Sequence, residues 1–194
     1  MYKPPDSTLA LWGVLLGIAV AFIYFMQWRA MDQAMRIDER AWITIIQKEK
    51  AVTVSAPTAT LQITNTGKTP ALEISAKAFI EVVPLGTDPH FDRDPGVPAS
   101  VTSTGVLIPN YPHEFEVVRR RRVGSSFLVE EDSFTTDEAT SLKAGKSYMA
   151  TYGTAVYQDI FHQPHWIHFC FSEILPAGTY APPSCAEYNA VDEK

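Results

Sequence analysis

Four consecutive arginines, Arg119 to Arg122, form the densest charged segment of the sequence. Each guanidinium presents a planar fork of donors that matches a carboxylate or another anion. The run fits two roles: a solvated strand edge that deters aggregation, offset by neighbouring glutamates, or a surface that binds an acidic protein partner. Lipid headgroups fit less well, since the run is far in sequence from the apolar N-terminal segment. We take forward partner binding as the functional hypothesis for Arg119, Arg120, Arg121 and Arg122.

Three histidines, His162, His165 and His168, share a spacing of three residues, which on a helix would roughly gather them on one face as metal ligands. The surrounding residues instead predict a hairpin, with a turn over Phe161 to Pro164 and a returning strand after it. Side chains alternate along a strand, so His165 and His168 should point to opposite faces. Asp159 is near, but no cluster of carboxylates accompanies the histidines. We therefore predict no metal site and no cofactor.

Catalytic signatures are absent from the sequence. It contains no GxSxG elbow, no HExxH zinc motif, no GxxxxGKS phosphate loop and no GxGxxG motif. Asp88, Asp92 and Asp94 are spaced like calcium ligands, but their loop lacks the central Gly and downstream Glu of an EF-hand. The net charge of −6 argues against nucleic-acid binding, because contacts to phosphates come mainly from Lys and Arg. We expect neither an enzyme nor a nucleic-acid-binding protein.

Cys170 and Cys185 are the only cysteines, 15 positions apart. Two cysteines cannot form an all-thiolate zinc site, and the sequence has no CxxCH haem motif. They are either two unrelated thiols of a cytosolic protein or a disulfide that fastens the Pro-rich C-terminal segment to a strand. We favour the disulfide, which would contribute about 3 kcal/mol in the chain-entropy model. A disulfide in turn indicates an oxidising compartment, periplasmic or extracellular.

The elements that must position these residues begin with an apolar N-terminal segment. Ser7 to Trp28 are 22 residues without a charge, and as a helix they would extend roughly 33 Å, enough to cross a hydrocarbon core of about 30 Å. The segment ends in bulky residues rather than the small ones of a signal-peptide cleavage site, which favours an uncleaved anchor. Gly13 and Gly17 have the GxxxG spacing that lets two membrane helices pack closely.

Two signals in the sequence predict opposite orientations of this anchor. Lys3 precedes the span, whereas Arg29, Arg36 and Arg40 follow it, so charge counting would keep the C-terminal part in the cytoplasm. Long domains translocate largely regardless of such counts. The cysteine pair leads us to expect the C-terminal domain in the periplasm.

After the anchor, the hydrophobic pattern changes to short strands. Good helix formers continue to Glu39 and predict a stalk, and Thr136 to Leu142 is the one later helix candidate. Thr87 to Ser103 is expected to be a long surface loop. We predict a mainly β fold, an antiparallel immunoglobulin-like sandwich. The predicted strands are residues 41–46, 51–54, 60–64, 71–83, 105–108, 115–118, 126–129, 148–157 and 166–171. The expected organisation is a tail over residues 1–7, a transmembrane helix over 8–28, a stalk over 29–39 and the sandwich over 40–194.

Several short motifs resemble a group of uncharacterised bacterial single-pass membrane proteins with an N-terminal anchor and an immunoglobulin-like domain. The motifs are Arg36-Ile37-Asp38-Glu39-Arg40-Ala41-Trp42, Ile63-Thr64-Asn65-Thr66-Gly67-Lys68-Thr69-Pro70-Ala71, Tyr157-Gln158-Asp159-Ile160-Phe161, His165-Trp166, Phe169-Cys170, and Cys185 with Tyr188-Asn189. The resemblance covers most of the chain. It implies the architecture and no particular activity.

The functional expectation is a non-catalytic, membrane-anchored accessory or scaffolding subunit of a larger membrane protein complex. The bilayer and that complex are its expected partners, and the expected location is the bacterial inner membrane. The alternative is a periplasmic sensor or ligand-binding module that uses the loops around Thr87 to Ser103.

Overall fold

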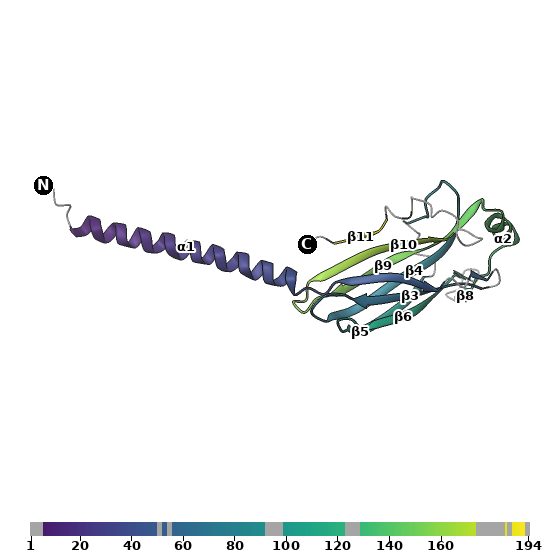
Figure 1. Ribbon diagram of the computed structural model, residues 1–194, viewed down its shortest axis with the longest axis horizontal. Helices are drawn as coiled ribbons and strands as arrows, with labels where there is room; N and C mark the ends of the chain where they lie inside the picture. The colour runs from purple at the N-terminus through teal and green to yellow at the C-terminus, as the bar shows by residue number, and fades with distance from the viewer. Residues whose placement is uncertain are drawn as a thin grey trace. The chain divides into compact units, whose positions relative to one another are not determined.

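A computed structural model describes residues 6–49, 52–53, 56–91, 99–122, 129–173, 185 and 188–192. The chain divides into two compact units, residues 1–40 and residues 41–194, and each is described by itself (Figure 1).

The first unit is one continuous helix, α1, from Asp6 to Asp38. Its part from Leu11 to Asp38 is long and apolar enough to cross a membrane, and none of its most apolar window is buried inside the chain. Beyond Trp28 the helix continues through the predicted stalk, where an ion pair between Arg36 Nε and Asp32 Oδ2 (3.0 Å) links neighbouring turns. A helix of this composition is a candidate membrane anchor or signal segment.

The second unit contains two antiparallel sheets that pack against each other. The first sheet consists of β1 (Ile43–Glu49), β2 (Val52–Thr53), β3 (Ala56–Asn65) and β6 (Pro112–Val118). Strands β1, β2 and β6 each pair with β3. The second has the order β11 (Ala190–Val191), β10 (Pro164–Glu173), β9 (Ser147–Gln158), β4 (Ala71–Pro84) and β5 (Ser100–Leu107). A separate hairpin pairs β7 (Arg120–Arg122) with β8 (Val129–Glu131).

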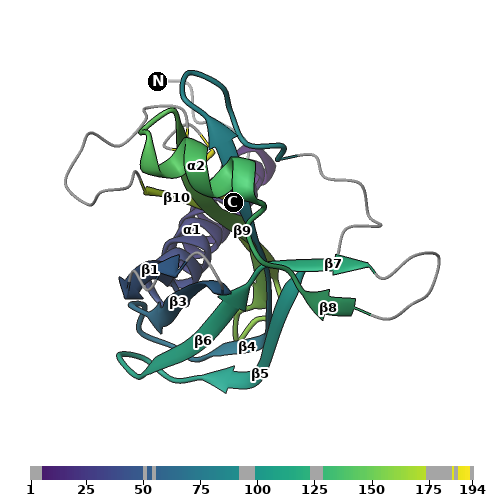
Figure 2. The same cartoon turned by 90° about the vertical axis from the view of Figure 1, so that its right-hand side faces the viewer.

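The connections between the sheets give the sandwich its topology. The chain passes from the first sheet to the second between β3 and β4, returns between β5 and β6, and crosses again before β9 (Figure 2). Such Greek-key crossings between antiparallel sheets are typical of immunoglobulin-like sandwiches. The predicted fold class is therefore confirmed.

The main core lies between the two sheets. Ile74, Ala76, Ala78 and Ile80 alternate along β4 and are buried, as the period of two in a strand requires. They pack with inward residues of the first sheet such as Leu61, and each fully buried Leu or Ile stabilises the fold by roughly 1.5–3 kcal/mol.

Strands β4 and β9 approach each other closely at Gly153. An added Cβ atom there would lie 2.0 Å from the carbonyl oxygen of Lys77. No side chain fits at that distance, so the pairing at this point requires glycine.

A second, smaller core covers the outer face of the second sheet. Its buried members are Val83, Tyr148, Ala150, Tyr152, Cys170 and Cys185. The rings of Phe91 and Tyr188 stack above it with centroids 3.9 Å apart. Residues near the C-terminus thus cover a sheet face that would otherwise expose aromatic side chains.

Helix α2, Thr136–Lys143, matches the predicted helix over Thr136 to Leu142. Thr135 caps its N-terminus in a capping box with Glu138, and Leu142 is buried in the main core. The hairpin β7–β8 and α2 lie at the same end of the sandwich (Figure 2).

The prediction of a loop over Thr87 to Ser103 is wrong at its end, because β5 begins at Ser100. The sequence there is Ser-Val-Thr-Ser-Thr, whose polar residues resemble a loop, although a strand at a sheet edge tolerates them. Residues 92–98 of that segment, and residues 126–128 of the predicted strand over 126–129, lie outside the described residues.

Candidate functional site

The arginine run is divided by the structure into two environments. Arg119 is four-fifths buried and donates from Nη1 and Nη2 to the two carboxylate oxygens of Glu138, at 2.8 and 3.0 Å. Its Nε lies 3.4 Å from Asp132 Oδ2, and its guanidinium lies 5.7 Å from the ring centroid of Phe134. Arg119, Asp132 and Glu138 form the Arg119 cluster, which joins the end of β6 to α2.

Glu138 in this cluster is held in its ionised form. Burial alone would raise its pKa, but the hydrogen bonds from Arg119 and from the Thr135 backbone, together with the charge of Arg119, outweigh burial and lower the pKa. The bidentate geometry is the one that guanidinium and carboxylate groups favour. Arg119 is thus already bound by a carboxylate of its own chain.

The other three arginines lie on β7. Arg120 pairs with Glu131 and Arg121 with Glu130 across the hairpin, while Arg122 pairs with Val129. Opposite charges at directly paired positions stabilise a hairpin by roughly 0.2–1 kcal/mol. Arg120, Glu130 and Glu131 are exposed, so the hairpin presents both signs of charge to the surroundings.

The predicted helix-packing residues Gly13 and Gly17 lie on an open surface of α1. A Cβ atom added at either position would meet nothing within 4 Å. The described residues therefore leave space for another helix at these positions, and the packing role of the two glycines stays a prediction.

The predicted disulfide between Cys170 and Cys185 is present, with the Cα atoms 5.4 Å apart. Asn189 reinforces it: its Oδ1 accepts the Cys170 N–H at 2.7 Å, and its Nδ2 donates to the Cys170 carbonyl at 3.4 Å. The side chain of Asn189 thus bonds to β10 as a neighbouring strand would.

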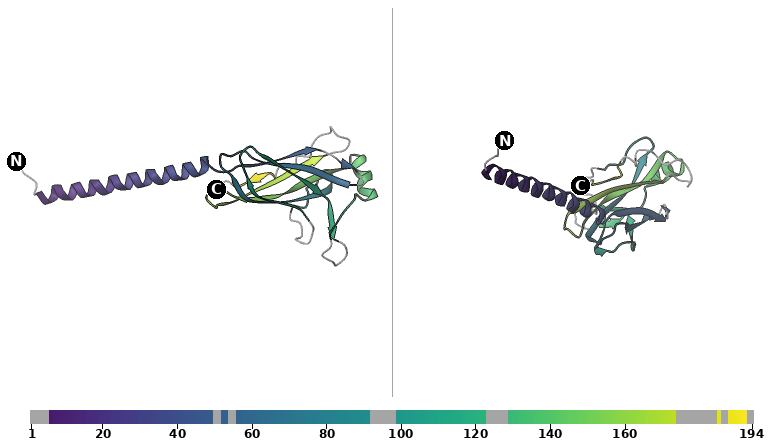
Figure 3. Two further views of the ribbon diagram at one scale, coloured as in Figure 1. Left: turned by 90° about the horizontal axis from the view of Figure 1, so that it is seen from below. Right: turned by 60° about the vertical axis from the view of Figure 1, so that its left-hand side comes forward.

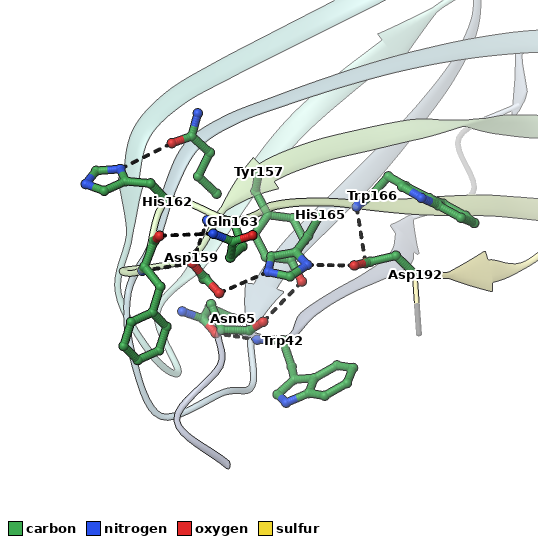
Figure 4. Close-up of polar contacts among 12 residues, drawn as sticks. Trp42, Asn65, Tyr157, Asp159, His162, Gln163, His165, Trp166 and Asp192 are labelled. Atoms are coloured by element: carbon green, nitrogen blue, oxygen red, sulfur yellow. Dashed lines mark hydrogen bonds and ion pairs between the residues drawn. The ribbon is translucent and has the colours of Figure 1, made fainter. Parts of the chain in front are cut away.

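His165 lies between two carboxylates, an arrangement that the sequence did not predict. Its Nδ1 lies 2.6 Å from Asp192 Oδ2, and its Nε2 lies 3.1 Å from Asp159 Oδ2 (Figure 4). The side chains of His165, Asp159 and Asp192 are only 4%, 6% and 10% exposed. We call these three residues the His165 cluster.

Asp159 begins the turn between β9 and β10. Its Oδ1 accepts the N–H groups of Phe161 and Gln163 at 2.8 and 2.9 Å, which is why Asp suits this position. Burial would raise its pKa, but these bonds and the contact with His165 outweigh burial and lower it.

Asp192 holds the C-terminal strand at the other side of the ring. Its Oδ1 accepts the Trp166 N–H at 3.2 Å, and its own N–H donates to the Trp166 carbonyl at 3.2 Å. Sequence reasoning noted Asp159 near the histidines but missed Asp192, which is 27 residues from His165. No local pattern signals a contact of that separation.

The other two histidines are arranged differently. His168 contacts Thr154 Oγ1 through Nδ1 at 2.9 Å, and burial lowers its pKa. His162 lies in the turn with a φ of 58°. Among the described residues, no group of three or more His, Cys, Asp or Glu side chains is placed to hold a metal ion.

A hollow of about 360 Å³ opens beside Trp166, which is 38% exposed. Its polar lining includes Glu73, whose φ of 51° falls at a bulge between β4 and β9. Gln158 Nε2 donates to Glu73 Oε2 at 2.8 Å. A non-glycine residue in this backbone region costs of order 1–3 kcal/mol, and here the bulge places Glu73 in the lining of the same hollow as Trp166.

Comparisons with known proteins add little to this geometry. No family model matches the chain, and no curated protein matches it. A crystal structure assigned to the ApaA protein of Bordetella pertussis is similar to 70% of this chain and to 92% of its own, with 15% sequence identity and a TM-score of 0.32. A likeness at that TM-score supports no statement about function.

Proposed function

We propose that the chain is a membrane-anchored, non-catalytic accessory subunit of a larger membrane protein complex, which docks through α1 and through its sandwich. The observation that carries this proposal is the exposure of α1: among the described residues, none of its most apolar window is buried. Apolar surface of this extent is stable only when lipid or another protein covers it.

The part of α1 beyond the predicted span supports docking as well as anchoring. Trp28, Met31 and Met35 are 63%, 72% and 51% exposed, and their spacing of three and four residues puts them on one face of the helix. A helix that only linked the membrane to the sandwich would need no such apolar face.

The hairpin β7–β8 is the proposed docking element of the sandwich. Because Arg119 is engaged by Glu138, the proposal for partner binding now rests on Arg120, Arg121 and Arg122. Arginine is enriched among interface residues that contribute most to affinity.

The proposal includes a bacterial inner membrane with the sandwich on the periplasmic side. The disulfide supports this side, because such bonds persist in oxidising compartments. The arginines that follow the span favour the opposite orientation, so the location requires its own test.

The experiment is purification of the tagged full-length chain in mild detergent, with quantification of the proteins that co-purify. We expect a membrane protein in stoichiometric amount. A variant with Arg120→Ser, Arg121→Ser and Arg122→Ser should recover less of it, with the larger loss at low salt, where charge attraction is least screened.

The matched control is Lys143→Ser with Lys146→Ser, which removes positive charge at the same end of the sandwich. It should leave recovery unchanged. If the triple-arginine variant recovers as much partner as the wild type at both low and physiological salt, the hairpin is not part of the interface. The absence of any membrane protein partner would contradict the accessory role.

A second candidate function, a sensor or ligand-binding module, is favoured by the hollow beside Trp166. This hollow is a different place from the loops around Thr87 to Ser103, where the sequence led us to expect a ligand to bind. Residues 92–98 of those loops lie outside the described structure. Native mass spectrometry of the same preparation tests it: a retained small molecule that is lost in a Trp166→Ala variant would support this function over the first.

A further inference from the structure

We propose that the His165 cluster is a pH-dependent fastening that holds the C-terminal segment, residues 188–192, against β10 when the imidazole is charged and releases it when the imidazole is neutral. The segment contains β11, which pairs with Ile167 and His168 (Figure 3).

The hydrogen atoms of the cluster decide the charge of the ring. Both ring nitrogens lie at hydrogen-bond distance from a carboxylate oxygen, and an ionised carboxylate can only accept. A neutral imidazole has one N–H, so one carboxylate would face a lone pair. Both contacts are satisfied together only when the ring carries two N–H groups and a positive charge.

The cluster is buried enough for this mismatch to matter. A buried carboxylate that loses a hydrogen-bond donor is destabilised, because burial limits the access of water to the lost bond. Asp159 retains two backbone N–H donors from its own turn. Asp192 accepts the Trp166 N–H at 3.2 Å and follows β11, a strand of only two residues. Asp192 is therefore the partner that should detach.

Among the described residues, ionisable groups come near the ring from several elements. Asp159 approaches from the turn, Asp192 from the position after β11, and Tyr157 from β9 with ring centroids 5.2 Å apart. Glu73 of β4 lines the same hollow as His165. The Tyr157 hydroxyl donates its proton to the Ala41 carbonyl at 3.1 Å. The groups at hydrogen-bond distance from the ring nitrogens are the carboxylates of Asp159 and Asp192.

Detachment would be local. The disulfide at Cys185 and the bonds of Asn189 to Cys170 do not depend on the ring, so the segment would remain tethered while β11 opens. Opening would uncover the edge of β10 at Ile167 and His168. It would also widen a hollow of about 470 Å³, lined by β1 and β10 and closed on one side by Asn189, Ala190 and Val191.

The test is hydrogen exchange of the full-length protein in detergent between pH 5.5 and 9, corrected for the intrinsic pH dependence of exchange. We expect protection of the Asp192 amide and of the adjacent β10 edge to fall as pH rises. The fall should approach tenfold per pH unit where closing takes up one proton. Protection of α2 should stay constant over the same range and serves as the internal reference.

The variant Asp192→Asn distinguishes this fastening from a merely structural contact. With Oδ1 still accepting the Trp166 N–H, the new amide nitrogen would face His165 Nδ1 and could donate to a neutral ring. The pH dependence should therefore reverse, with stronger protection at pH 9 than at pH 5.5. Unchanged protection of the wild-type segment across the range would overturn the proposal, and so would an Asp192→Asn variant that loses protection with rising pH as the wild type does.

Discussion

The Arg119 cluster and the His165 cluster both place one basic side chain between two carboxylates, yet they differ in burial and in the identity of that side chain. The Arg119 side chain is 20% exposed and joins β6 to a helix with its own capping box. The His165 side chain is 4% exposed and holds a two-residue strand. Arginine stays charged at any physiological pH, whereas histidine changes charge between about pH 5 and 8. On the proposal above, one cluster is a permanent joint and the other a conditional one.

The largest effect should follow from removing the basic side chain of the more buried cluster. His165→Leu would leave Asp159 and Asp192 buried without their shared partner, and breaking a buried pair in this way costs about 3–5 kcal/mol. Chemical denaturation of the full chain, monitored by the fluorescence of the sandwich, measures this loss of unfolding free energy. His162→Asn is the matched control, because asparagine tolerates the left-handed backbone of that exposed position, and it should change stability little. A loss below about 1 kcal/mol for His165→Leu would show that the cluster is not a joint at all.

The disulfide should rank next. Replacing Cys170 and Cys185 with Ser should lower the free energy of unfolding by about 3 kcal/mol for a loop of this length. Because the disulfide and the His165 cluster fasten the same segment, the double change should also make the hydrogen exchange of residues 188–192 faster at every pH. Digestion without reduction should yield the two cysteine peptides joined. Quantitative alkylation of both thiols in the folded, unreduced protein would contradict the pairing.

A smaller loss should follow from removing the cation of the more exposed cluster. Arg119→Met keeps the aliphatic stem but leaves Glu138 without its bidentate partner, at a cost of about 1 kcal/mol, as for partly solvated pairs. Removing Arg120 instead should cost less, since its paired Glu131 is exposed. If the two single variants lose the same stability, the division of the arginine run into two environments is wrong.

Acid should weaken both clusters, and this is the smallest predicted difference. Asp159 and Glu138 have folded-state pKa values below their ordinary ones. Their contributions are therefore fully present above about pH 4, where the unfolded groups titrate, and are lost as pH falls through the lower folded values. Glu138→Gln should flatten the dependence of unfolding free energy on pH between 5 and 3. Above pH 6 it should lower the unfolding free energy by a constant amount, because the ion pair with Arg119 is lost, and leave the pH dependence unchanged. A slope identical to the wild type would contradict the lowered pKa of Glu138.

The sequence predicted what depends on local pattern. Alternation at Leu61 and Ile63 indicated β3, and the acidic first turn of Asp137 and Glu138 indicated α2. It also predicted the cysteine pair, since two cysteines leave one intramolecular pairing. These features are set by residues within a few positions of one another or by counting.

What the sequence did not reveal depends on contacts between distant residues. Arg119 and Arg120 look alike in the run, and only the position of Glu138, 19 residues later on a helix, separates a buried ion pair from an exposed one. Asp192 follows a strand of two residues that is too short to produce a pattern. In both cases the partner is brought close by the packing of the sandwich.

The claim that α1 anchors the sandwich on the oxidising side of a membrane is tested most directly by reporter fusions after Lys194. An alkaline phosphatase fusion, which is active only after export, should be active in membranes, and a cytoplasmic reporter at the same position should be silent. The cysteine pair and the interpretation of the apolar helix as an uncleaved anchor together predict that result. A silent phosphatase with an active cytoplasmic reporter would contradict it, and would restore the orientation that the arginines after the span favour.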